Sequence, residues 1–97
     1  MEQLAKALTR EKVALEALEV AIIQLKPFYG KPNGSGAGFI KEFIDGLINR
    51  TPVEIHRVYC LDLENFRAIQ AILEAMSCRA GDVRLILIEK FRGANHE

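Results

Sequence analysis

The chain has 97 residues, of which 49% are hydrophobic, and its 13 Lys and Arg balance 13 Asp and Glu. This length predicts one domain, residues 1–97, and the apolar fraction is too high for a disordered chain. A net charge of zero gives no general attraction for nucleic acid or anionic lipid, so we expect neither as a partner. Two cysteines, no signal-peptide pattern and no apolar stretch that could cross a membrane predict a cytoplasmic protein with free thiols.

The first predicted element is a long helix over residues 2–25, which Pro27 ends. Five of its apolar residues follow a seven-residue repeat: Leu8, Leu15, Leu18, Ile22 and Leu25. From Val13 onward a second apolar set makes the helix apolar on nearly every side. Such a helix needs cover on more than one side, either as the central helix of a small fold or by packing against a second copy.

Residues 26–38 contain two prolines and four glycines, which predicts a loop. We interpret this loop as a flexible connector, with an anion site at the start of the next helix as the alternative. An amphipathic helix is then predicted over residues 38–49. Its apolar face consists of Phe39, Ile40, Phe43, Ile44, Leu47 and Ile48.

The last part of the chain, residues 53–91, has the pattern of a βαβ unit. Apolar-rich runs at 53–61 and 83–91 predict two parallel strands, and Asp62 is expected to cap the helix between them. The predicted fold is therefore α+β, in the order α-α-β-α-β, with a frayed tail at 92–97. Two strands make a poor sheet, so we expect either helices on both faces or a four-stranded sheet that continues across a homodimer.

A ligand site is a candidate at the carboxyl ends of the two expected strands, where ligands bind in parallel sheets. Asp62 and Glu64 follow one strand there, and Lys90 and Arg92 lie at the end of the other. The same residues could instead cap a helix and contact solvent. No cofactor, metal or catalytic residue is predicted.

A Cys–His pair needs consideration because His56 and Cys60 lie close in sequence. On a strand, residues four apart are separated by about 13 Å, whereas a nucleophile and its base need about 3 Å. His56 therefore cannot activate Cys60 within a strand. Cys60 and Cys78 are interpreted as small apolar residues.

The chain contains Phe28-Tyr29-Gly30, followed by a second helix, by Pro52 before an expected strand, and by a final helix and strand. This order resembles that of barstar-type ribonuclease inhibitors. In that family an aromatic-Tyr-Gly turn precedes an acidic binding helix. The resemblance implies that Tyr29, Glu42 and Asp45 contact a nuclease or another toxin.

The main prediction is a non-catalytic protein-interaction module that forms a homodimer. Abundant apolar residues and the lack of convergent catalytic groups favour it. One alternative is a barstar-like inhibitor. The other is a small-ligand-binding protein or enzyme with its site at the strand ends.

Overall fold

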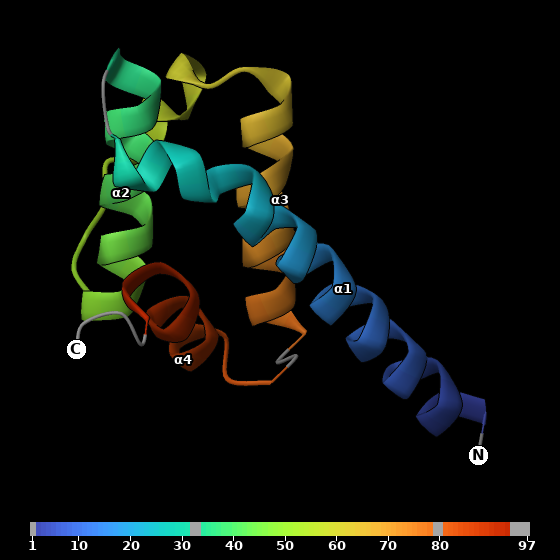
Figure 1. Ribbon diagram of the computed structural model, residues 1–97. Helices are drawn as coiled ribbons and strands as arrows, with labels where there is room; N and C mark the ends of the chain where they lie inside the picture. The colour runs from blue at the N-terminus through green and yellow to red at the C-terminus, as the bar shows by residue number, and fades with distance from the viewer. Residues whose placement is uncertain (1, 32–33, 79–80, 94–97) are drawn as a thin grey trace.

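The computed structural model describes residues 2–31, 34–78 and 81–93, and these contain helices only. In chain order they form α1 (Glu2–Gly30), α2 (Gly34–Asn49), the 3₁₀ helix η1 (Ile55–Cys60), α3 (Leu63–Ser77), α4 (Val83–Leu87) and the π-helical turn η2 (Ile88–Arg92). The C-terminal half of α1 lies against the other helices, while its N-terminal half runs away from them (Figure 1).

The predicted α+β fold is wrong, because neither expected strand exists in the described residues. The segment 83–91 is helical, and its buried residues Val83, Leu87 and Phe91 follow one another at steps of four. That spacing places them on one side of a helix. Asp82 caps this helix, since its carboxylate accepts a hydrogen bond of 3.1 Å from the backbone N–H of Leu85.

The other expected strand forms the short helix η1, which contains no buried residue. Val58 is half-buried against the core, and Arg57 forms an ion pair with Glu42 of α2. Because residues 2–31, 34–78 and 81–93 contain no strand, they offer no sheet edge, and the predicted four-stranded sheet across a homodimer is also wrong. The strands of the barstar-type element order are likewise absent from the described residues.

The predicted loop at 26–38 is largely helical. α1 continues through Pro27 to Gly30, and α2 begins at Gly34, four residues before its expected start. A proline inside a helix costs about 3 kcal/mol, since it removes a hydrogen bond and crowds the preceding turn. Phe28 and Tyr29 pack against the core just beyond the proline, and this burial offsets the cost.

The helix predicted after Asp62 is confirmed as α3. The Asp62 carboxylate accepts a hydrogen bond of 3.0 Å from the Asn65 backbone N–H, as expected for an N-cap. Leu73 and Met76 of this helix are exposed. The buried residues are instead Asn65, Ala68, Ile69, Ile72 and Ala75.

The core forms where α2 and α3 cover one side of α1. Leu18 and Leu25 of α1 are almost inaccessible to solvent, as are Phe39 and Ile44 of α2. The expected apolar face of α2 is confirmed, except that Leu47 is only partly buried. Asn49 ends α2, and Arg50 follows in the left-handed conformation with φ of 59°.

Gly46 allows the chain after α2 to fold back onto that helix. The backbone N–H of Thr51 donates to the Gly46 carbonyl at 3.0 Å. A Cβ at Gly46 would overlap Val53 Cγ2 and would lie 3.1 Å from the Thr51 carbonyl oxygen. Only glycine fits this approach without a shift of the backbone.

We predict that Gly46→Ala lowers the free energy of unfolding by about 1–3 kcal/mol, because the new methyl group overpacks this contact. Alanine favours helices more than glycine does, but that gain is smaller than the cost of overpacking. Gly38→Ala is the matched control within α2. Its new Cβ would meet only the flexible Arg57 guanidinium at 3.9 Å, so it should stabilise by up to about 1 kcal/mol. Urea unfolding followed by circular dichroism measures both variants. Equal stability of the two would contradict the close approach.

Candidate functional site

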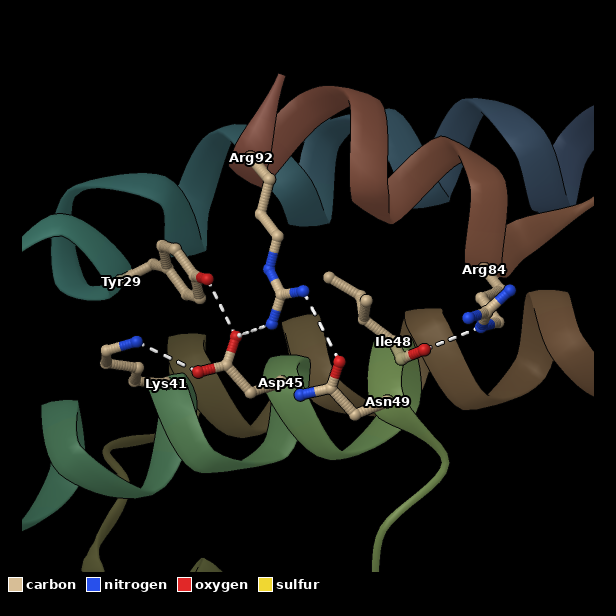
Figure 2. Close-up of polar contacts among 7 residues, drawn as sticks. All are labelled: Tyr29, Lys41, Asp45, Ile48, Asn49, Arg84 and Arg92. Atoms are coloured by element: carbon tan, nitrogen blue, oxygen red, sulfur yellow. Dashed lines mark hydrogen bonds and ion pairs between the residues drawn. The ribbon is translucent and has the colours of Figure 1, made fainter. Parts of the chain in front are cut away.

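A polar cluster surrounds Asp45 in the C-terminal half of α2 (Figure 2). Its carboxylate accepts three hydrogen bonds, from Tyr29 Oη at 2.7 Å, Lys41 Nζ at 2.9 Å and Arg92 Nη2 at 2.8 Å. The donors come from the end of α1, from α2 itself and from the end of η2. One carboxylate therefore joins the three segments.

The helices bring these groups together in a simple way. Lys41 and Asp45 are four residues apart on α2, the spacing at which helical side chains meet. Arg92 also donates to Asn49 Oδ1 at 3.3 Å, one turn further along α2. The Tyr29 ring packs against Phe91, with centroids 5.0 Å apart, and Lys41 Nζ lies 4.7 Å from the Tyr29 ring centroid.

The electrostatics of the cluster favour ionised Asp45. Partial burial alone would raise the pKa of this carboxyl, but the hydrogen bonds from Lys41, Tyr29 and Arg92 outweigh burial and lower its pKa below the usual range. The hydrogen bond to Asp45 raises the pKa of Lys41. The pKa of Arg92 is raised by its interactions with Tyr29 and then with Asp45. All three charged groups are thus held in their charged forms.

This arrangement is a closed clamp rather than an open binding site. Both oxygens of Asp45 already have protein partners. A second tie lies nearby, where Arg84 Nε donates to the Ile48 carbonyl near the end of α2 at 2.6 Å (Figure 2). Together the two contacts fasten the C-terminal segment to α2.

Residues that belonged to two separate predicted sites lie together in the structure. Tyr29 and Asp45, expected to contact a toxin, meet Arg92, which was expected to bind a ligand. Sequence reasoning missed Lys41 and Asn49 as members of this cluster. The spacing of Lys41 and Asp45 was a usable signal, whereas nothing in the sequence pattern placed Asn49 beside Arg92.

The remaining predicted site residues lie in other places. Asp62 caps α3, and Glu64 in the first turn of α3 lines a groove against α1. Lys90 lines a small pocket between α1 and the C-terminal segment. Glu42 pairs with Arg57 of η1. The described part of the chain has no strand edge that could gather the predicted ligand-binding residues.

The histidine and cysteine of η1 do not form a catalytic pair. The distance argument from a strand no longer applies, since four residues of a 3₁₀ helix rise only about 8 Å. His56 and Cys60 are both exposed, and no hydrogen bond joins them. Cys60, which the sequence suggested as a small apolar residue, is exposed, whereas Cys78 is partly buried. Across the described ranges no three His, Cys, Asp or Glu side chains gather as a metal site.

A second feature is an apolar row on the outward side of α1, which we call the outer stripe. It consists of Val13, Val20 and Ile23, which are 57%, 67% and 68% exposed. The buried residues of α1, including Leu18 and Leu25, lie on the opposite side of the helix. The other helices therefore cover one face of α1 and leave the outer stripe in solvent.

The outer stripe adjoins a shallow groove of about 420 Å³ between α1 and α3. Small side chains dominate its lining, with Ala17 and Ala21 from α1 and Ala68 and Ala71 from α3. Beside the groove, Gln24 Nε2 donates to Oδ1 of the buried Asn65 at 2.9 Å, which ties the two helices together. Val20 belongs both to the groove and to the outer stripe.

Comparisons of the chain with protein-family models, with curated proteins and with solved structures found no match. Among the helices of the described ranges, none has the length and hydrophobicity needed to span a membrane. A functional proposal therefore depends on the two features above, the clamp and the outer stripe.

We predict that Asp45→Asn lowers the free energy of unfolding at neutral pH by about 1–2 kcal/mol. The value is small because Lys41 and Arg92, which pair with Asp45, are partly exposed to solvent. Because folding lowers the pKa of Asp45, its contribution is complete well above the ordinary carboxyl value of 3.8 and declines as the pH falls through the lowered pKa. The stability difference between wild type and Asp45→Asn should therefore shrink in acid.

Glu74→Gln is the control, since it removes an exposed carboxylate of α3 that forms no ion pair in the described structure. Urea unfolding between neutral pH and pH values below the ordinary carboxyl pKa measures all three proteins. A difference between wild type and Asp45→Asn that does not change with pH would contradict the clamp.

Proposed function

We propose that this chain is a non-catalytic protein-interaction module that self-associates as a homodimer through the outer stripe of α1. The observation that carries the proposal is the exposure of Val13, Val20 and Ile23, each more than half accessible, along one side of the longest helix. Single exposed apolar residues are ordinary, but several on one side of a helix, here with Glu16 between Val13 and Val20, mark an interface.

The spacing of the outer stripe suits another helix as its partner. Val13 and Val20 are seven residues apart and Ile23 follows three later, which is the alternation of a helix–helix seam. The alanine-lined groove beside the stripe offers room for the edge of an approaching helix. These features support binding along the length of α1 rather than capture of a small molecule.

A second copy of the chain fits this surface in two general respects. Each copy has a net charge of zero, so two copies do not repel one another over long distances. Two-fold pairing of identical surfaces is also the commonest form of protein association. Two free thiols suit a reducing compartment, and we place this function in the cytoplasm.

The polar chemistry of the chain supports binding rather than catalysis. Within the described residues, no cysteine or serine side chain hydrogen-bonds to a histidine or a carboxylate. The most connected carboxylate, Asp45, is occupied by the clamp. Its role in this proposal is to hold α2 and the C-terminal segment on the face of α1 opposite the outer stripe.

We predict that wild type sediments as a dimer in analytical ultracentrifugation and dissociates on dilution, and that Val20→Glu shifts it to monomer. A charge at the centre of the seam would have to be buried without a partner on association. Leu85→Glu is the matched control, because Leu85 is half exposed on α4 and lies outside the outer stripe. This control should remain dimeric.

Circular dichroism verifies that both variants stay folded. A wild-type monomer at every concentration would contradict the proposal. An unchanged dimer in Val20→Glu would show that the outer stripe is not the interface.

A further inference from the structure

We infer that the two copies pair their α1 helices antiparallel, with Val20 of each copy opposite Ile23 of the other. The inference rests on the proposed self-association and specifies its geometry. It follows from the charged residues beside the outer stripe, which favour this register and disfavour the alternatives.

Extending the seam along α1 gives positions separated alternately by three and four residues. The residues at these positions are Val13, Glu16, Val20, Ile23 and Pro27. One edge of the seam carries exposed charges at steps of seven, namely Lys12, Glu19 and Lys26. Their signs alternate as plus, minus and plus, so the register of two copies decides whether like or opposite charges meet.

Parallel pairing is unfavourable for this sequence. Two parallel copies in register would bring Glu16 of one beside Glu16 of the other within the seam, and like charges in contact repel. Across the edges, Glu19 would then lie beside the neutral Gln24 of the second copy. Parallel pairing thus has a repulsive contact and no compensating ion pair.

One antiparallel register removes the repulsion and adds attraction. When Val20 lies opposite Ile23, the two-fold axis passes between residues 21 and 22. Glu19 of each copy then lies beside Lys26 of the other, so the attractive pair occurs twice. Glu16 falls opposite Pro27 rather than opposite another carboxylate. The central layers of the seam are entirely apolar.

The next antiparallel register, shifted by seven residues or about two turns, reverses these contacts. With the axis near residue 18, Val13 would lie opposite Ile23. Glu19 would then approach Glu19 of the second copy, and Lys12 would approach Lys26. This register also places Glu16 opposite Val20 within the seam, so both the seam and the edge charges disfavour it.

The charges that set this register are available in each copy. Glu19 and Lys26 are exposed, and neither belongs to an ion pair in the described part of the chain. Glu19 shares the rim of a small pocket with Lys90, yet the two form no ion pair there. Association would give both side chains a partner of opposite charge.

Charge reversal tests the register. Glu19→Lys and Lys26→Glu should each raise the dimer dissociation constant by about 5-fold at low salt, because each replaces two attractive pairs with two repulsive ones. The double variant, Glu19→Lys with Lys26→Glu, should return it to within about 2-fold of wild type, because opposite charges meet again. High salt should reduce all these differences. Glu74→Lys, the same change on an exposed site of α3, should have no effect.

Sedimentation equilibrium separates the outcomes. A wild-type dimer whose single variants are weakened and whose double variant recovers supports the antiparallel register. A wild-type dimer without that recovery, or one tightened by Lys26→Glu, overturns the register and leaves the self-association intact. A monomeric wild type overturns both.

Cysteine cross-linking tests the direction of the helices independently of charge. In a Cys60→Ser and Cys78→Ser background, Val20→Cys combined with Ile23→Cys should give a covalent dimer on mild oxidation, since residues 20 and 23 face each other. Val20→Cys alone should cross-link slowly, because the two residues 20 lie on either side of the axis. Cross-linking of Val20→Cys alone as fast as that of the double variant would overturn the inference.

Discussion

Burial of one face of α1 is the interaction on which the other elements depend. Leu18, Ile22 and Leu25 are almost inaccessible, and α2, α3 and η2 all contact this helix. The shorter helices depend on this core through α2 and α3, since η1 packs against α2, and α4 packs against α2 and α3. With five residues in α4 and six in η1, neither would persist alone, because isolated helices below about 12 residues are marginal in water.

The clamp around Asp45 has a different structural role from this apolar core. Burial of Phe91 favours contact of the C-terminal segment with the rest of the chain, but apolar contact is not directional. The hydrogen bonds of Arg92 and Arg84 with α2 specify where the segment lies along that helix. Because Asp45 also binds Tyr29, the same contact fixes the end of α1. The core supplies most of the stability, and the clamp supplies the alignment.

The sequence allowed correct prediction of those elements whose local signals agree with their packing. The cap of α3 at Asp62 and the apolar face of α2 are examples. The segment 83–91 was mispredicted because a short continuous apolar run suits a strand or a helix equally well. Two helical signals were present, the cap at Asp82 and the step of four between Val83 and Leu87. A strand at 83–91 would need a second strand to pair with, and the described chain has none. No local sequence pattern reveals whether such a partner strand forms.

The clamp and the proposed interface differed in how far the sequence could predict them. The members of the clamp come from segments up to 63 positions apart, since Tyr29 and Arg92 both bind Asp45, and sequence spacing cannot place such groups together. The outer stripe was visible in advance as the second apolar face of α1, with a second copy as one possible cover. Folding of the described chain covers the first face with α2, α3 and η2 and leaves Val13, Val20 and Ile23 exposed. Loss of the expected strand edges therefore moves the proposed dimer contact to the helix, where the sequence holds apolar surface that one copy does not bury.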